Sequence, residues 1–414
     1  MTKYSIKDLA LDGKRVFIRV DFNVPIKNGV IGDDTRMTSS LPTIQYALDQ
    51  GATVVLASHL GRPKGKPHPS AQSPRAGDPG PAPEFSLKPV AAHLATLLDR
   101  PVGFADECIG DPAQKAVAAA HANPKSRVVL LENLRFHPEE EKNDDGFATG
   151  LAALADAYVN DAFGAAHRAH ASVAAIVRHF SSAGAGLLME KELKYLGLAL
   201  GDADRPFVAV IGGAKVSDKI DVIESLLGRV DRLLIGGAMA YTFFKALGMP
   251  VGKSLVENDK LDEARAIMSH AKARGVVLQL PVDHVVAAEI EASATTQVLK
   301  VGDAAIGDRM GLDIGPESAR LYAGLLADAK TVVWNGPMGV FEIEAFARGT
   351  IAVANAVAAV KGTTIIGGGD SVAAINGAGV ADKITHISTG GGASLEFLAG
   401  VELPGVAALP DRKL

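Results

Sequence analysis

Charged and polar side chains in the first half of the chain recur directly after short apolar segments that we predict to be strands. They are Asp21, Asn23, His59, Arg62, Arg135 and Arg168, with Arg36 in a polar stretch before the second strand. In open α/β sheets, ligands bind at the carboxyl ends of the strands, so these side chains are expected to converge. A planar guanidinium binds phosphate or carboxylate through two parallel hydrogen bonds. The pattern therefore predicts a site for a small anion that carries both groups.

Each of these residues also has an ordinary explanation. A single arginine is most often a solvated surface residue. Asp21 and Asn23 could shape a turn, and the ring of His59 could serve structure alone. Recurrence at successive strand ends favours the ligand site. His167 and His170 have no Cys or acidic partner at ligand spacing, which argues against zinc there.

The second half of the chain is marked by glycine clusters after its predicted strands. They fall at 212–213, 236–237, 335–339, 367–369 and 390–392. Glycine lets backbone N–H groups approach phosphate, and a helix N-terminus stabilises anions. One Gly–Gly pair is often only a tight turn, but five clusters predict a nucleotide site. Lys215 and Lys219 are expected on one helical turn facing a polyphosphate, and Asp370 could hold Mg²⁺ through one carboxylate.

Two familiar nucleotide motifs fail at their defining positions. The nearest match to a Walker A loop, around 252–254, has Leu247 in place of the first glycine and Pro250 inside the loop. The dinucleotide fingerprint fails because Val372 and Leu395 occupy its last glycine position. A P-loop enzyme and a two-domain dehydrogenase are therefore disfavoured. A non-catalytic two-lobed binding protein is disfavoured by the lysine pair.

Short β-branched segments alternate with longer Ala- and Leu-rich segments, as in parallel sheets whose strands are joined by helices. We expect strands at 15–20, 53–57, 128–131, 157–160, 207–211, 232–235, 276–280, 331–334, 363–366 and 386–388. Helical periodicity predicts helices at 41–50, 89–98, 216–227, 260–274, 317–327 and 345–360. The predicted fold class is α/β, with doubly wound parallel sheets covered by helices on both faces.

The chain of 414 residues is longer than one hydrophobic core usually organises, so we expect two domains. A small-residue stretch at 181–186 leads into an amphipathic segment at 187–200, which is predicted to be a linker helix between them. The stretch at 67–83 is rich in Pro, Gly, Ser and Ala and is predicted to be a loop.

The composition, with 48% hydrophobic and 21% charged residues and a formal charge of -5, is that of an ordinary globular protein. It gives no electrostatic reason to expect nucleic acid or an anionic membrane as a partner. The first residues carry Lys3, Lys7 and Asp8 where a secretory signal needs an apolar run, and the lone Cys108 cannot form an intramolecular disulfide. We expect a cytoplasmic monomer.

Nine sequence blocks, spread over nearly the whole chain, resemble the phosphoglycerate kinase family and occur in its order. They are RVDFNVP at 19–25, DDTR at 33–36, SHLGRPKG at 58–65, ENLRF at 132–136, AHRAH at 166–170, GGAKVSDKI at 212–220, WNGPMGVFE at 334–342, GGGDS at 367–371 and STGGGASLE at 388–396. The resemblance implies two Rossmann-like domains that close about a hinge. It implies reversible phosphoryl transfer between ATP and 3-phosphoglycerate, yielding ADP and 1,3-bisphosphoglycerate, with Mg²⁺ as cofactor.

The resemblance also implies domain limits and site residues. It implies a 3-phosphoglycerate domain at 1–184 on which the tail 396–414 packs, a hinge helix at 185–200 and a nucleotide domain at 201–395. The family's phosphoglycerate positions are matched by Asp21, Asn23, Arg36, His59, Leu60, Gly61, Arg62, Arg135 and Arg168. Its nucleotide positions are matched by Gly213, Lys219, Gly237, Asn335, Pro337, Val340, Glu342, Gly368, Gly369, Asp370 and Ser371.

The implied reaction needs little acid–base help, because a carboxylate nucleophile with a pKa of about 4 is already ionised at pH 7. Catalysis must then come from positioning and from cations that stabilise the charge of the transferring group. We assign this role to Arg36 in the first domain and Lys215 in the second, with Lys219 as the third catalytic residue, which holds the nucleotide phosphates together with Mg²⁺. Asp370 is the expected metal ligand, and Glu342 the expected ribose ligand.

Overall fold

The computed structural model describes residues 3–63 and 83–412. The predicted loop at 67–83 therefore lies outside the described residues, except for Pro83. The chain forms two compact units, Met1–Leu193 with Glu402–Leu414, and Lys194–Val401. The division falls inside α6 (Leu187–Leu200), a helix predicted at the same residues.

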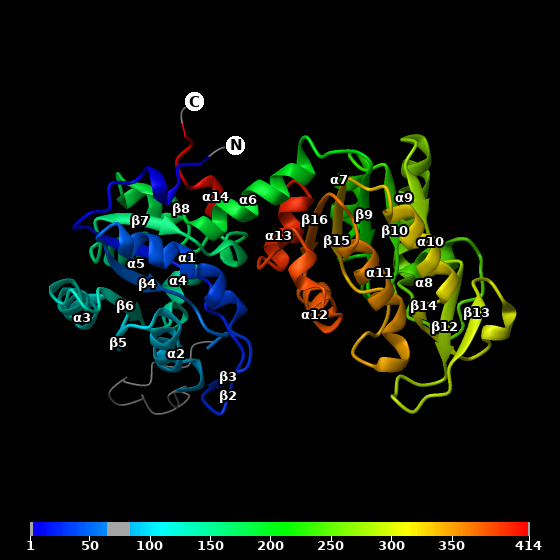
Figure 1. Cartoon of the computed structure of the whole chain (residues 1–414), viewed down its shortest axis with the longest axis horizontal. Helices are drawn as coiled ribbons and strands as arrows, with labels where there is room; N and C mark the ends of the chain where they lie inside the picture. Colours follow the sequence, from blue (N-terminus) through cyan, green and yellow to red (C-terminus); the bar gives the residue numbers. More distant parts are fainter. Residues whose placement is uncertain (1–2, 64–82, 413–414) are drawn as a thin grey trace. The chain divides into compact units, whose positions relative to one another are not determined.

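The N-terminal unit is built on a six-stranded parallel sheet in the order β5-β6-β4-β1-β7-β8 (Figure 1). Its strands are β1 (Arg15–Arg19), β4 (Thr53–Ala57), β5 (Gly103–Ala105), β6 (Val128–Leu131), β7 (Ala157–Asn160) and β8 (Ala183–Ala185). After β1, the chain adds β4 on one side of β1 and later adds β7 on its other side. Such a reversal opens a crevice at the carboxyl ends of the strands, which is where the predicted anion ligands follow β1, β4, β6 and β7.

Helices cover this sheet because its strands are apolar on both faces. The helices are α1 (Thr35–Asp49), α2 (Lys88–Leu98), α3 (Gly110–Ala122), α4 (Pro138–Glu141) and α5 (Asp145–Ala152). Buried side chains of α1 and α2 form one core cluster with Val16 and Ile18 of β1. Phe17, between them, points to the opposite face, where it stacks on Tyr158.

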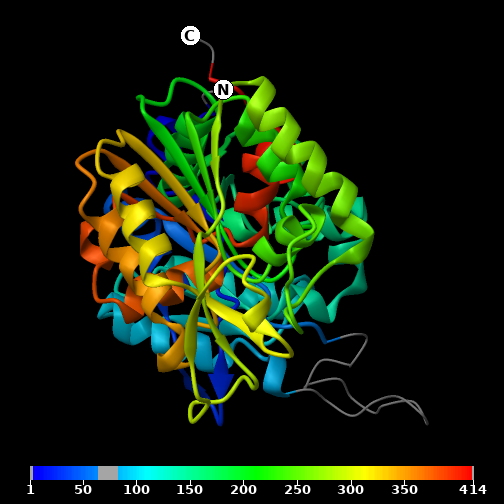
Figure 2. The same cartoon turned by 90° about the vertical axis from the view of Figure 1, so that its right-hand side faces the viewer.

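The C-terminal unit repeats this plan with the strand order β11-β10-β9-β15-β16-β17. Its strands are β9 (Phe207–Ile211), β10 (Arg232–Ile235), β11 (Val277–Gln279), β15 (Thr331–Asn335), β16 (Thr363–Gly367) and β17 (His386–Ile387). Its helices are α7 (Ile220–Leu227), α8 (Ala240–Ala246), α9 (Leu261–Ala273), α10 (Pro316–Leu326), α11 (Arg348–Ala358), α12 (Gly369–Gly377) and α13 (Gly392–Leu398). Helices lie on both sides of the sheet (Figure 2), and the cluster under α10 and α11 includes the buried Trp334.

Three further features complete the two units. A small antiparallel sheet in the C-terminal unit contains β12 (Asp283–Ala287), β13 (Gln297–Lys300) and β14 (Met310–Ile314). A hairpin in the N-terminal unit contains β2 (Ile26–Lys27) and β3 (Val30–Ile31). The tail, with α14 (Pro404–Ala407), packs in the N-terminal unit, where Gly405 N–H donates to the carbonyl of Ala166.

The predicted α/β class and all ten predicted strands are confirmed, with ends shifted by at most one residue. The stretch at 181–186, which leads into the predicted linker helix, contains the buried edge strand β8, which was not predicted. The short strand β5 and the antiparallel sheet were not predicted. Three helices begin three or more residues away from their predicted starts. Helix α1 begins at Thr35 and continues through Pro42, α7 begins only at Ile220, and α11 begins at Arg348.

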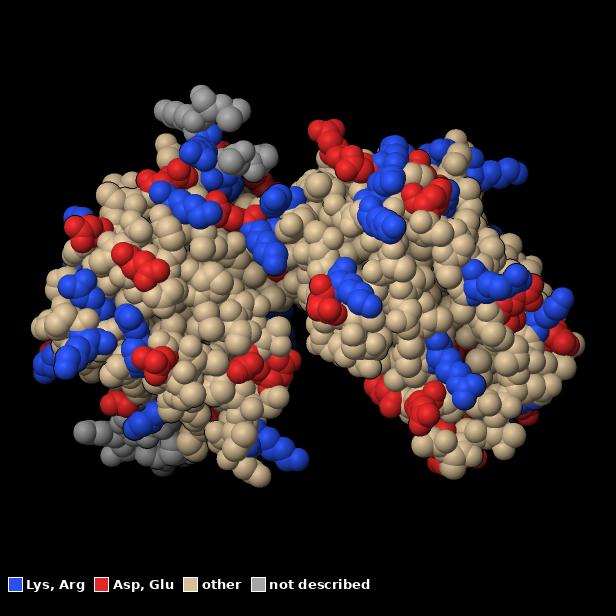
Figure 3. Space-filling view, in the orientation of Figure 1, with Lys and Arg blue, Asp and Glu red and all other residues tan. Residues whose placement is uncertain are grey.

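Charged side chains of both signs are interspersed over each unit on the face drawn in Figure 3. Within the part of the chain that the structure describes, helices are too short or too polar to span a bilayer.

Candidate functional site

Five of the predicted anion ligands meet at the carboxyl ends of the strands of the N-terminal unit: Asp21, Asn23, Arg36, Gly61 and Arg135. Arg36 Nη1 lies 3.3 Å from Asp21 Oδ2 and donates to the carbonyl of Asn23 at 3.1 Å. The amide oxygen of Asn23 accepts from the N–H of Gly61 at 2.9 Å. Arg135 Nη1 then donates to the carbonyl of Gly61 at 2.8 Å. Residues from four separate segments are thus joined by direct contacts.

The loop after β4 is held in place by Asn133, a residue that the sequence did not single out. Its side-chain oxygen accepts from Leu60 N–H at 3.1 Å, and its side-chain nitrogen donates to the Leu60 carbonyl at 2.8 Å. Leu60 itself is buried, whereas Arg62 and Arg168 are exposed. The loop therefore presents Gly61 and Arg62 from a fixed backbone.

Beneath this patch lies a buried polar network that the sequence analysis missed. Arg19 is fully buried, and its Nε donates to Ser172 Oγ at 2.8 Å while its Nη2 lies 3.2 Å from His59 Nδ1. The Ser172 hydroxyl in turn donates to the buried Glu140 at 2.6 Å. A buried charge needs such partners. The available signal was an arginine at the end of an otherwise buried strand.

These cations and burial together set the protonation of the histidines. Burial, then the nearby Arg19, Arg135 and Arg36, hold the pKa of His59 well below its ordinary value. The same causes, with Arg168 in place of Arg36, lower the pKa of His170 to about 4. Both rings are therefore neutral at pH 7, and the positive charge of the patch comes from its arginines.

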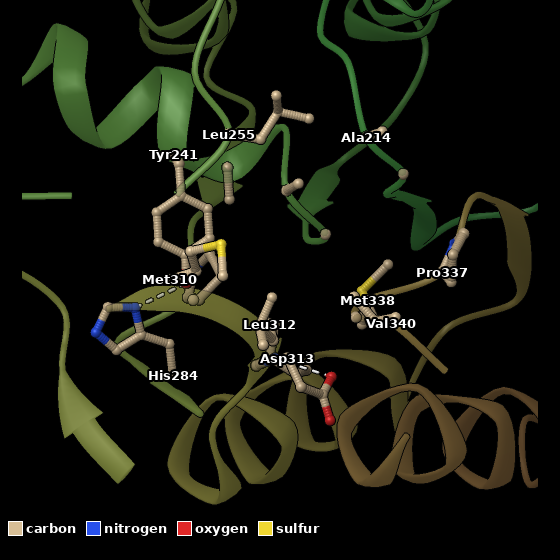
Figure 4. A pocket seen from close by; sticks show the side chains of 18 of the residues that line it. Ala214, Tyr241, Leu255, His284, Met310, Leu312, Asp313, Pro337, Met338 and Val340 are labelled. Carbon is tan, nitrogen blue, oxygen red and sulfur yellow. Dashed lines mark hydrogen bonds between the residues drawn. The ribbon is translucent and has the colours of Figure 1, made fainter. Parts of the chain in front are cut away.

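The C-terminal unit contains a pocket of about 320 Å³ beside the carboxyl ends of its strands. Six predicted nucleotide ligands line it: Gly213, Gly237, Pro337, Val340, Glu342 and Asp370. Figure 4 shows apolar side chains such as Leu255, Met310 and Leu312 around the cavity, with Tyr241 hydrogen-bonded to His284. Apolar walls with a few polar groups suit a flat aromatic ring. These wall residues were not predicted.

The other predicted nucleotide ligands lie at the end of β15 and at the start of α12, with Lys219 bonded to Asn335. Lys219 Nζ donates to the side-chain oxygen of Asn335, and burial lowers the pKa of Lys219 against the attraction of Asp218 and Asp370. Ser371 Oγ accepts from the N–H of Gly336 at 2.5 Å. Gly368 caps α12, and Gly369 and Asp370 form its first turn.

The glycine clusters have a structural role as well. A Cβ on Gly237 would lie 2.5 Å from the backbone nitrogen of Gly213 and 2.8 Å from the carbonyl of Pro337, at a positive φ of 69°. Three loops therefore touch through their backbones, and only glycine fits there. Gly213 and Gly369, by contrast, have open space where a Cβ would stand.

The expectation that Lys215 and Lys219 share a helical turn is wrong, because α7 begins only at Ile220. Lys215 is exposed and lies near Glu257. Against the effect of burial, hydrogen bonds from Ser217 and then the charge of Lys215 lower the pKa of Glu257. Lys219 is half-buried at Asn335. The two ammonium groups therefore differ in mobility and in environment.

A family model described as phosphoglycerate kinase matches residues 6–401. The chain belongs to the phosphoglycerate kinase family. The phosphoglycerate kinase of Moorella thermoacetica is 58% identical over 413 residues and that of Koribacter versatilis 55% over 420 residues, each alignment covering 100% of both chains. Among solved structures, the phosphoglycerate kinase from Coxiella burnetii matches with a TM-score of 0.84 and 42% identity. The phosphoglycerate kinase from Pyrococcus horikoshii OT3 matches with a TM-score of 0.78 and 34% identity. Each of these two structural matches covers 98% of both chains.

A phosphoglycerate kinase working with Mg²⁺ must offer the ion oxygen ligands. Asp370 supplies one exposed carboxylate at the pocket, beside Lys219. Mg²⁺ is commonly held by one or two carboxylates, with phosphates and water completing its shell. The residues therefore fit the ion in company with a bound nucleotide.

Proposed function

We propose that this chain transfers a phosphoryl group reversibly between ATP and the carboxylate of 3-phosphoglycerate. The observation that carries the proposal is the arginine patch in which Arg36 and Arg135 are hydrogen-bonded to the loops after β1 and β4. Arg168, after β7, lies close enough for its charge to lower the pKa of His170. A ligand bearing one phosphate and one carboxylate matches several guanidinium forks better than a single anion does.

In this proposal the N-terminal unit binds 3-phosphoglycerate. Arg62, Arg135 and Arg168 pair with its phosphate and carboxylate, while Asp21 and Asn23 accept or donate to its hydroxyl. His59 is neutral and can therefore hydrogen-bond without repelling the arginines. Leu60 and Gly61 supply backbone groups.

The C-terminal unit binds ATP or ADP. The apolar walls near Val340 take the base, Glu342 the ribose, and the loops at Gly213, Gly237 and Pro337 the phosphates. Lys219, oriented by Asn335, pairs with the phosphates, and Gly368, Gly369 and Ser371 shape the first turn of α12 beside them. Bound through Asp370, Mg²⁺ would neutralise phosphate charge.

For the transfer, a carboxylate oxygen of 3-phosphoglycerate attacks the γ-phosphorus of ATP, and the bond to the β-phosphate oxygen breaks, leaving ADP and the acyl phosphate. No proton moves in this step. Arg36 and Lys215 stabilise the negative charge of the transferring group. Since the two ligands belong to different units, turnover requires closure about the hinge, which also keeps water from the acyl phosphate. We further propose a cytoplasmic monomer.

The decisive experiment incubates the full chain with Mg-ATP and 3-phosphoglycerate and measures ADP. We expect ADP formation that depends on both substrates and on a divalent ion, together with hydroxylamine-trappable acyl phosphate. ADP formation without 3-phosphoglycerate would indicate an ATPase, and no ADP at all from folded protein would refute the proposal.

A further inference from the structure

Glu107, Cys108 and His137 bring a carboxylate, a thiol and an imidazole together in the N-terminal unit. One potential ligand atom of each lies within 4.8 Å of the others, and within residues 3–63 and 83–412 no other group of three such side chains meets this condition. Glu107 and Cys108 follow strand β5, and His137 is the N-cap of α4. The cluster thus joins two strand-end segments.

The sulfur of this cluster is buried, whereas its other two side chains are partly exposed. Cys108 is fully buried, whereas the side chains of Glu107 and His137 are 29% and 25% exposed. His137 Nε2 lies 2.7 Å from Glu107 Oε1, and the Cys108 N–H donates to the same oxygen at 2.8 Å. Phe147 stacks on the His137 ring with centroids 4.9 Å apart, which fixes its orientation. An ion would therefore meet the two partly exposed ligands first.

We propose that Glu107, Cys108 and His137 bind a zinc ion, with water as the fourth ligand. One sulfur, one nitrogen and one oxygen are ligand types that Zn²⁺ accepts in tetrahedral sites. Bond lengths of about 2.0 to 2.3 Å place tetrahedral ligand atoms about 3.4 to 3.6 Å apart. The histidine and carboxylate atoms must separate slightly and move toward the buried sulfur, which these two partly exposed side chains permit.

Binding breaks the hydrogen bond between His137 and Glu107. The proton of that bond moves to solvent or to the other ring nitrogen, and the freed nitrogen and the carboxylate each bind the ion. The Cys108 thiol gives its proton to solvent as the Zn–S bond forms, so charge and atoms balance. Burial raises the pKa of this thiol, which opposes proton loss without the ion.

The simpler explanation is a core cysteine beside an ordinary histidine–carboxylate pair. The chain contains such a pair without sulfur, since His93 Nε2 lies 2.8 Å from Asp34 Oδ2. His93→Gln is therefore a matched control for His137→Gln. Each variant removes a partly exposed imidazole that contacts a carboxylate, and the two nitrogen–oxygen distances, 2.8 and 2.7 Å, are nearly the same.

The test titrates the full chain with Co²⁺ and reads the ultraviolet–visible spectrum. Because Cys108 is the single cysteine in the sequence, any thiolate-to-cobalt charge-transfer band reports on this site. We expect such a band in the wild type, its displacement by Zn²⁺, and its loss in Cys108→Ala. Mutating residues that only hydrogen-bond to metal ligands already changes metal affinity by about 10- to 100-fold. Losing a ligand itself, in His137→Gln or Glu107→Gln, should therefore weaken Co²⁺ binding by at least about 100-fold. His93→Gln should match the wild type.

Absence of the band in folded wild-type protein would overturn the proposal. So would a band whose affinity is unchanged in both His137→Gln and Glu107→Gln, because the sulfur would then bind metal alone. Circular dichroism checks that each variant is folded. If Cys108→Ala fails to fold, the two exposed-ligand variants still decide the outcome.

Discussion

The two candidate sites are made of different parts of the chain. In the N-terminal unit, side chains form the site, and buried groups such as Arg19 and Glu140 support them from below. In the C-terminal unit, glycine loops form most of the site, and they touch one another through their backbones. The first arrangement depends on charge, and the second on the absence of side chains.

This difference has consequences for how each site fails. A charged patch loses affinity when one arginine is removed, and it responds to pH and salt. A backbone site tolerates changes at its exposed side chains but not an added methyl group where loops meet. The lysines are the exception in the C-terminal unit, because they bring charge to an otherwise backbone site.

Replacing Lys215 should have the largest effect on catalysis. If backbone groups bind the nucleotide while Lys215 serves the transfer step, Lys215→Ala should lower kcat by about 100-fold, or roughly 3 kcal/mol, with little change in either KM. Steady-state kinetics with both substrates varied measures this. Lys253→Ala, which removes another exposed lysine of the same unit, is the control. An unchanged kcat with a raised KM for ATP would move the catalytic role to Lys219.

An alanine at Gly237 should damage the C-terminal unit through its backbone. A Cβ there meets the Gly213 backbone at 2.5 Å, at a φ of 69°, so we expect a loss of about 3 kcal/mol. Gly248 has a φ of 78° but open space, so Gly248→Ala should lose only about 1 kcal/mol. Urea unfolding followed by fluorescence of Trp334, the single tryptophan, reports on this unit. Equal losses in the two variants would show that contact between the loops is unimportant.

The contrast between the two sites also explains what the sequence could predict. Apolar strands such as β4 and β9 were predicted to the residue, because a strand buried on both faces gives an unbroken β-branched segment. The edge strand β8 was missed because Ala183–Ala185 has no such signature. Its identity as a strand depends on pairing with β7, which is a tertiary contact.

Site residues on strand-end loops were predicted because their position follows from topology. Asn133, Arg19 and Glu140 were not, since their roles depend on which distant groups they meet. The apolar wall around Tyr241 and Met310 was missed for the same reason, because it comes partly from a small sheet that was not predicted. Local sequence also misplaced the start of α7, where Lys219 is drawn to Asn335 rather than into a helical turn.

The charged site should give the N-terminal unit a measurable sensitivity to acid. Burial and the arginines lower the pKa of His170 to about 4 in the folded unit, against about 6.5 when unfolded. Between these values the unfolded chain binds more protons, so stability present at pH 7 is lost as the pH falls. From pH 7 to pH 5 this amounts to about 2 kcal/mol.

His170→Gln should remove the part of this pH-dependent loss of stability that protonation of His170 causes. Urea unfolding of both proteins at pH 7 and pH 5, followed by circular dichroism, gives the difference, in which all other titrating groups cancel. An identical pH dependence in the variant would mean that the pKa of His170 is the same in the folded and the unfolded chain.

The smallest effect is expected at Arg62, an exposed member of the anion patch. Its charge is screened by water, so Arg62→Ala should raise the KM for 3-phosphoglycerate by about 10-fold, leave kcat nearly unchanged, and lose part of this effect in high salt. Arg135 has a side chain only 8% exposed and donates to the Gly61 carbonyl at 2.8 Å. Arg135→Ala should therefore raise the same KM further and resist salt, because a buried guanidinium is screened less. Measuring both variants at low and high ionic strength separates the two behaviours. If Arg62→Ala instead lowered kcat at saturating substrate, Arg62 would act in the transition state, and the division between an exposed binding arginine and the catalytic cations would fail.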